Sequence, residues 1–80
     1  MHHGLLVTLD VHMLVQAGAC LDDALFEAVG AVNKIGKTTA SKYYYWHIKT
    51  RRVPPPRRGV RTRDQLPPWL QGIVSEVNWL

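Results

Sequence analysis

The most regular hydrophobic pattern of the chain lies between residues 21 and 35. Apolar residues recur there every three or four positions: Leu21, Ala24, Leu25, Ala28, Val29, Val32 and Ile35. This spacing lays one apolar stripe along a helix. Asp22, Asp23 and Glu27 lie near its beginning, where carboxylates favour the positive end of the helix dipole. Gly30 within the stripe costs about 1 kcal/mol against alanine, so we expect this position to need a residue without a side chain.

The pattern before this helix fits two structures. Apolar residues at every second position from Leu5 to Val11 are typical of a strand. The later apolar positions suit a helix capped by Asp10 and closed by Gly18. We favour a helix from about Asp10 to Ala17 after a short extended piece, because Gly18 supplies a stop. Strand and helix both stay open for residues 4–12.

A tight turn and a further helix follow residue 32. The turn is formed by Asn33, Lys34, Ile35 and Gly36. A helix is expected from Lys37 to about Lys49, with Thr38 or Thr39 as its cap. Four residues share the side of that helix that would turn inward, and they are Ala40, Tyr44, His47 and Ile48.

The rest of the chain changes character twice. Residues 51–63 hold too many prolines and too few apolar residues for a helix, and Pro54–Pro56 favour an extended path. Gly59 permits a sharp turn, and two short strands of a basic wing would start at Val53 and Val60. The alternative is a solvated arginine loop. A C-terminal helix over about residues 67–79 is expected, because Pro67 and Pro68 suit a first turn and apolar positions follow at helical spacing.

Charge is strongly segregated along the chain. All ten lysines and arginines lie within residues 34–63, where there is no Asp or Glu, and the six carboxylates lie outside that block. The net charge of +4 therefore hides a concentrated positive field. Such a field indicates a polyanionic partner, most commonly nucleic acid. Tyr43, Tyr44, Tyr45 and Trp46 are interleaved with the cations, and rings of this kind stack on bases or pack a core.

Two helices joined by a short turn, with Gly30 at their crossing and Ile35 as an apolar plug, resemble the core of many bacterial and phage helix-turn-helix proteins. The turn in that family usually carries glycine just before the plug, whereas this chain has Lys34 there and Gly36 just after. Together with the basic wing, residues 21–63 resemble small excisionase-like and MerR-like winged-helix domains of phages and plasmids. The resemblance implies a mainly α fold in one domain of residues 1–80, with a helix-turn-helix over about 21–50, a basic wing or loop over 51–63 and the C-terminal helix.

The resemblance also implies a function. The chain would bind double-stranded DNA at specific sequences in the cytoplasm, as a transcriptional regulator or a recombination accessory factor of a phage or mobile element. Side chains of the second helix would enter the major groove or contact its phosphates: Lys37, Thr38, Ser41, Lys42 and Tyr45. The remaining cations would grip the DNA backbone: Lys49, Arg51, Arg52, Arg57, Arg58, Arg61 and Arg63. A homodimer, which would place two basic blocks on one duplex, stays open.

Two other partners fit the same charge pattern. The positive block could dock on an acidic protein, as a small inhibitor or adaptor would. Alternatively, the aromatic cluster over residues 43–46 could bind single-stranded RNA.

Catalytic and metal-dependent functions are not expected. His2, His3, His12, His47 and Cys20 lack the spacing of a zinc site. Gly36, Lys37 and Thr38 match the end of a phosphate-loop motif. That motif also requires a glycine five residues earlier, where this chain has Ala31, and no strand is expected before the turn. We therefore predict no enzyme activity and no cofactor. A single cysteine points to a reducing compartment, and no apolar run reaches the roughly 18 residues of a membrane span.

Overall fold

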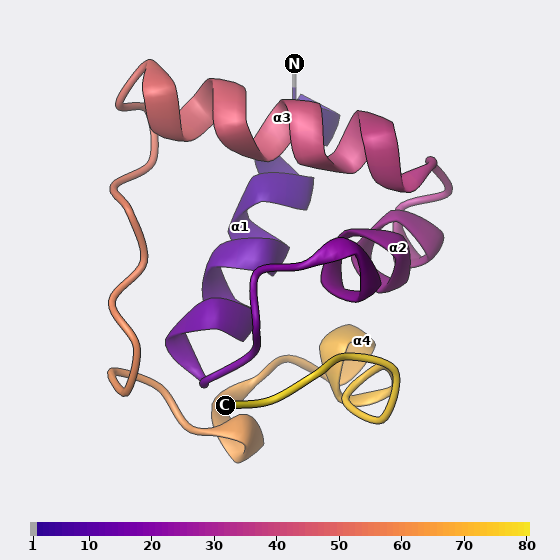
Figure 1. Ribbon diagram of the computed structural model, residues 1–80, viewed down its shortest axis with the longest axis vertical. Helices are drawn as coiled ribbons and strands as arrows, with labels where there is room; N and C mark the ends of the chain where they lie inside the picture. The colour runs from indigo at the N-terminus through magenta and orange to yellow at the C-terminus, as the bar shows by residue number, and fades with distance from the viewer. Residues whose placement is uncertain (1) are drawn as a thin grey trace.

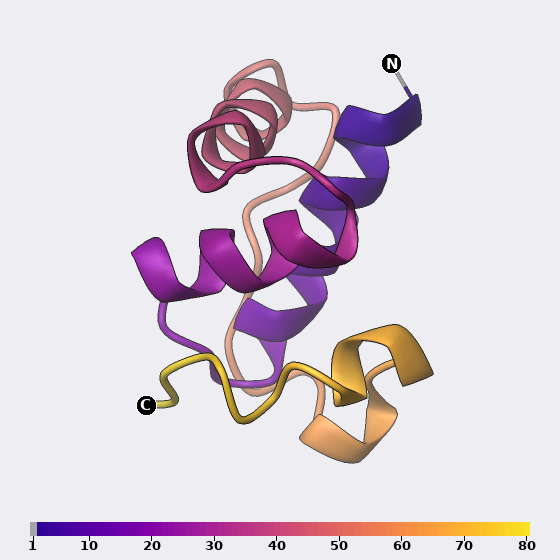
Figure 2. The ribbon, with the colours of Figure 1, turned by 90° about the vertical axis from the view of Figure 1, so that its right-hand side faces the viewer.

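Three packed helices and a C-terminal segment make up the computed structural model, which describes residues 2–80 and the side chains of residues 4–80 (Figures 1 and 2). The helices are α1 (His2–Gln16), α2 (Asp23–Val32) and α3 (Lys37–Lys49). A long connection then leads to the 3-10 turn η1 (Arg63–Gln65) and the short helix α4 (Pro68–Gln71). In Figure 1, α3 lies across one end of α1, and the connection runs along the side of the molecule to the opposite end of α1. The predicted mainly α class is confirmed.

The first helix is longer than the sequence pattern indicated. Neither the extended piece nor a strand is found over residues 4–12, because α1 runs without interruption from His2 to Gln16. Its buried apolar positions follow helical spacing and are Val7, Val11, Leu14 and Val15. The residues that had suggested a strand face alternate sides, with Leu5 and Leu9 exposed and Val7 buried. The stop at Gly18 is confirmed, with φ of 104°.

Asp10 does not cap α1 but joins it to two other segments. It lies in the middle of the helix and is only 6% exposed. One carboxylate oxygen accepts from Trp69 Nε1 at 3.0 Å, and the other accepts from Asn33 Nδ2 at 3.1 Å. These bonds fix the end of α2 and the start of α4 to the same point of α1.

Helix α2 begins at a carboxylate cap. Asp22 Oδ1 accepts from the backbone N–H of Leu25 at 3.1 Å, and Oδ2 accepts from Asn78 Nδ2 at 2.9 Å. Asp22 therefore caps α2 and also holds the C-terminal segment. The hydrogen bonds from Asn78 and Leu25 lower the pKa of the Asp22 carboxyl from its ordinary value of 3.8.

The turn between α2 and α3 explains Gly30. A Cβ built on Gly30 would lie 2.6 Å from the carbonyl oxygen of Ile35, a backbone atom that cannot move aside easily. The bounds of α3 are those expected, but neither Thr38 nor Thr39 caps it. The helix starts at Lys37, so its N-cap is Gly36, which has no side chain to offer.

Helices α1, α2 and α3 end in the same way. In each, the N–H of the second residue past the cap bonds to a carbonyl five residues earlier: Ala19 to Leu14, Ile35 to Gly30 and Arg52 to His47, at 3.0, 2.9 and 3.0 Å. This Schellman motif requires a left-handed residue just past the cap. That residue is Gly18 in α1, but Lys34 (φ 60°) in α2 and Arg51 (φ 59°) in α3. A left-handed residue with a side chain costs roughly 1–2 kcal/mol.

The inward face of α3 is the predicted one. Ala40, Tyr44 and His47 are buried, and Ile48 packs half-buried against the core. His47 Nδ1 lies 2.8 Å from the Tyr43 carbonyl oxygen and 3.2 Å from Thr8 Oγ1 of α1. The contacts of Thr8 place α3 against the N-terminal half of α1.

The C-terminal helix is much shorter than expected. It covers Pro68–Gln71 instead of about 67–79, and the chain continues in turns. The end of the chain is drawn to the link between α1 and α2 by Cys20 N–H bonding to the Asn78 carbonyl at 2.7 Å and Leu80 N–H bonding to the Gly18 carbonyl at 2.9 Å. A continuous helix could not present its backbone to that link. Leu70, Ile73 and Val77 are nevertheless buried.

The basic segment over residues 51–63 is a loop and not a wing. Strands are absent from residues 2–80, and the two expected to start at Val53 and Val60 do not form. Three successive prolines offer no N–H for strand pairing. The loop is attached to α1 instead, through Gly59 N–H and the Gln16 carbonyl at 2.9 Å.

We expect Gly30→Ala to destabilise the fold by about 1–3 kcal/mol, because the added methyl group overlaps a backbone oxygen. Gly72→Ala is the matched control, since a Cβ there meets nothing within 4 Å and its φ of −68° suits alanine. Urea unfolding of both variants measures the difference. Equal stabilities would show that α2 and α3 separate easily at this crossing.

We expect Asp22→Ala to lower the free energy of unfolding by about 1 kcal/mol near neutral pH, since it removes a helix cap. Because the pKa of Asp22 is lowered in the folded state, its stabilisation is present above the ordinary pKa of 3.8 and is lost as pH falls through the folded-state pKa. The gap between variant and unsubstituted protein should therefore close in acid. Unfolding curves at decreasing pH test this, with Glu27→Ala as a control of about 0.5 kcal/mol or less, because this exposed carboxylate of α2 makes no hydrogen bond or ion pair within residues 4–80. A gap that widens in acid would refute the assignment.

Candidate nucleic-acid interface

The outward side of α3 carries a row of exposed polar and aromatic residues. Thr38, Lys42, Tyr45 and Lys49 are all exposed, and their spacing of four, three and four residues aligns them along one side of a helix. We call these four residues the outer row. It lies opposite the buried Ala40, Tyr44 and His47. In Figure 2, α3 is seen end-on at the edge of the molecule, with α1 and α2 covering its other side.

The aromatic run is divided between core and surface. Tyr44 is 2% exposed, and burial raises the pKa of its hydroxyl, so it is a neutral core residue. Tyr45 is 52% exposed, although its ring centroid lies 5.8 Å from that of Phe26. Trp46 is 43% exposed beside the outer row, with the Arg52 guanidinium 5.1 Å from its ring centroid. Two rigid rings are thus accessible next to cations.

The predicted contact residues at the start of α3 differ in how accessible their side chains are to a ligand. Lys37 Nζ lies 3.5 Å from Asp23 Oδ2, and both side chains are largely exposed. This is the single ion pair among the side chains of residues 4–80. An exposed pair of this kind is worth about 0–1 kcal/mol, so Lys37 can exchange its partner for another anion. Ser41 is half-buried and donates to the Thr38 carbonyl at 2.9 Å. Ser41 therefore lies at the side of α3.

The arginines of the loop hold the molecule together. Arg58 donates to the Ala19 carbonyl, and Arg61 donates from Nε to Gln16 Oε1 at 3.2 Å. The Arg63 guanidinium lies 3.9 Å from the ring centroid of Trp79. These contacts tie the loop to the end of α1 and to the C-terminal segment. Arg57, which is exposed, makes no such bond within residues 4–80.

The basic block is consequently split in space. One group surrounds α3 and consists of Lys34, Lys37, Lys42, Lys49, Arg51 and Arg52. The other group consists of Arg57, Arg58, Arg61 and Arg63, and lies near the far end of α1 (Figure 1). Thr8 and Gln16, which mark where α3 and the loop touch α1, are separated by about 12 Å of helix. The candidate interface is therefore the first group together with the outer row.

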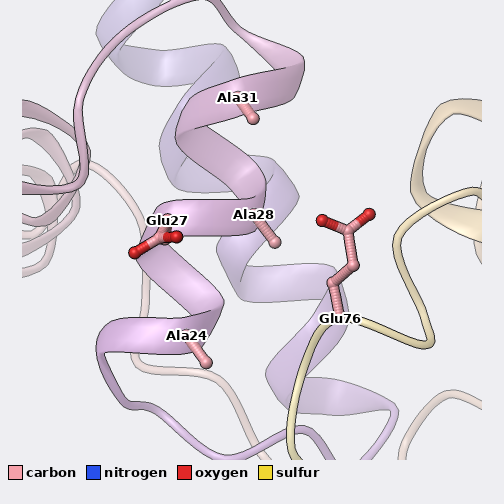
Figure 3. Close-up of a pocket in the computed structure, with 5 residues that line it drawn as sticks. All are labelled: Ala24, Glu27, Ala28, Ala31 and Glu76. Atoms are coloured by element: carbon pink, nitrogen blue, oxygen red, sulfur yellow. The ribbon is translucent and has the colours of Figure 1, made fainter.

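Negative charge gathers on another part of the surface. A hollow of about 350 Å³ is lined by Ala24, Glu27, Ala28 and Ala31 of α2 and by Glu76 of the C-terminal segment. Figure 3 shows the alanine side chains on the side of α2 that faces Glu76. With two carboxylates and no cation, this hollow is unsuited to a polyanion.

The described part of the chain offers neither a candidate metal site nor a membrane-spanning helix. No group of three or more His, Cys, Asp or Glu residues within it is placed to hold a metal ion. Within the same residues, no helix has the length and apolar character to cross a bilayer. Lys34 and Thr39 were missing from the expected contact residues, and Trp46 was expected only as part of the aromatic cluster over residues 43–46, yet all three are exposed near α3. Their membership of the block at 34–63 was visible in the sequence, but their exposure was not.

Comparison with known proteins does not extend these findings. No family model, curated protein or solved structure matches the chain.

We expect Arg58→Ala to destabilise the protein by about 1.5–3 kcal/mol, because it removes a charged donor from the Ala19 carbonyl. Arg57→Ala removes the same charge from the neighbouring position, where no such bond exists, and should change stability by about 0.5 kcal/mol or less. Thermal unfolding of both variants at equal ionic strength makes the comparison. If the two variants lost equal stability, net charge and not the tie to Ala19 would explain the effect.

Proposed function

We propose that this protein binds double-stranded DNA by placing α3 in the major groove. The observation that carries the proposal is the outer row, which combines two lysines, a threonine and a tyrosine on one exposed side of a 13-residue helix. No carboxylate occurs between residues 28 and 63, so nothing on α3 repels phosphate. The major groove admits an α-helix, lysine and threonine contact base edges as well as phosphates, and tyrosine contacts phosphates.

The geometry of the turn supports a helix-turn-helix interpretation. Lys34 precedes the plug residue Ile35, where that family usually carries glycine, and its φ of 60° is a value that glycine adopts readily. Gly30 permits the close approach of the turn. We propose on this basis a sequence-specific role in the cytoplasm, as a transcriptional regulator or a recombination accessory factor of a mobile element.

Phosphate contacts are assigned first to the cations around α3. The cations on or just beyond the helix are Lys34, Lys37, Lys42, Lys49, Arg51 and Arg52, whereas Arg58, Arg61 and Arg63 already serve the fold. About five neutralised phosphates give a slope of log affinity against log salt of roughly −4 to −5.

Fluorescence anisotropy with labelled duplex DNA tests the proposal. Lys42→Ala combined with Lys49→Ala should weaken binding by about 60-fold at about 0.1 M salt, since each phosphate contact is worth about eightfold there. It should also make the salt slope less negative by about 1.8. Arg57→Ala is the matched control, because it removes a cation at the far end of α1 and should leave affinity nearly unchanged. Absence of duplex binding, or equal losses in all variants, would overturn the proposal.

The same titration separates the two competing partners. Tighter binding to single-stranded RNA, abolished by Trp46→Ala, would favour stacking on the exposed rings. An acidic protein that binds the outer row in the absence of any nucleic-acid binding would favour a docking role. A single preferred sequence recovered from a random duplex pool would favour sequence-specific DNA binding.

A further inference from the structure

Two cations occupy backbone positions where a glycine would be more stable. The left-handed residue past the end of α2 is Lys34, and the one past the end of α3 is Arg51, with φ of 60° and 59°. The same position after α1 is taken by Gly18. The Schellman motif that follows α1 therefore contains glycine at this position. The two Schellman motifs that precede and follow α3 contain a cation there.

Neither cation is held by the rest of the fold. Both side chains are exposed, and within residues 4–80 neither makes a hydrogen bond or an ion pair. Arg51 lines a hollow of about 430 Å³ together with Ile48, Val53 and two prolines, and none of these residues offers its guanidinium a hydrogen-bond or ion-pair partner. No contact within the protein therefore explains why these two positions are not glycine.

Their separation suits the two edges of a groove. The 13 residues of α3 span about 20 Å, while the major groove is about 12 Å wide. Because α3 is longer than the groove is wide, residues just beyond both ends of a helix inserted obliquely into the groove come close to the phosphates that border it. The Schellman hydrogen bonds, at 2.9 Å for Ile35 and 3.0 Å for Arg52, fix the backbone beside each cation.

We propose that Lys34 and Arg51 are a pair of phosphodiester-binding residues that clamp the two DNA strands at opposite ends of α3. This inference rests on the proposed function. Strained backbone that persists without a structural reason is commonly found at binding sites, and here the strain places positive charge on a rigid support at both edges of the interface. The ligand at each position is one backbone phosphate.

Lys34→Gly and Arg51→Gly should each separate stability from binding. Glycine relieves the left-handed strain, so each variant should melt about 4 °C higher. Each should bind duplex DNA about eightfold more weakly at about 0.1 M salt, with a salt slope less negative by about 0.9. The double variant should combine both effects.

Two further variants at residue 34 separate charge from backbone flexibility. Lys34→Asn removes the charge but keeps a residue that tolerates the left-handed region, so it should reduce the salt slope as Lys34→Gly does. Lys34→Arg keeps the charge and should keep the slope. Glycine variants that are more stable yet bind with unchanged slope would overturn the inference, as would glycine variants that are no more stable. If the unsubstituted protein fails to bind duplex DNA, the proposed function itself fails.

Discussion

The arrangement of the helices depends on how closely the turn after α2 approaches Gly30. The Ile35 carbonyl occupies the space that a side chain at residue 30 would need, and the Ile35 N–H bonds to the Gly30 carbonyl at 2.9 Å. This contact folds the chain back within four residues and brings α3 onto α1 and α2. The inner face of α3 is then buried, and its outer row is left at the surface. The same constraint that builds the core therefore also creates the exposed face.

A chain of 80 residues buries only about 60% of its unfolded surface, so polar ties matter to its stability. Asp10 joins α1 to Asn33 and Trp69, Asp22 joins the cap of α2 to Asn78, and Arg58 joins the loop to Ala19. Each tie links segments that are far apart in the sequence. Part of the charge that marks the chain as basic is thus used to close the fold, which reduces the number of cations available to a partner.

The spacing of apolar residues and the positions of glycine predicted those features that depend on neighbouring residues. The bounds of α3, the core position of Tyr44 and the stop at Gly18 follow from spacing and glycine alone, and Gly30 marked the crossing of α2 with the turn. The start of α1 was missed because apolar residues at Leu5 and Leu9 are exposed, so the sequence pattern did not identify the buried face. The short α4 was missed because backbone bonds from residues 78 and 80 to the α1–α2 link decide the path of the chain end. Likewise, Arg58 and Lys42 belong to the same basic block in the sequence. In the structure, however, Arg58 forms a long-range hydrogen bond to Ala19 that stabilises the fold.

The cations that remain around α3 differ in how firmly they are placed. Lys42 and Lys49 extend from a regular helix and keep the freedom of long side chains, whereas Lys34 and Arg51 extend from backbone fixed by a Schellman motif. Ordering a flexible lysine or arginine on a ligand costs up to about 2 kcal/mol of side-chain entropy. A fixed backbone does not remove that cost, but it limits where the charge can lie. Left-handed strain of roughly 1–2 kcal/mol at each position is large for a domain of this size, which makes a purely accidental choice of lysine and arginine a poor explanation.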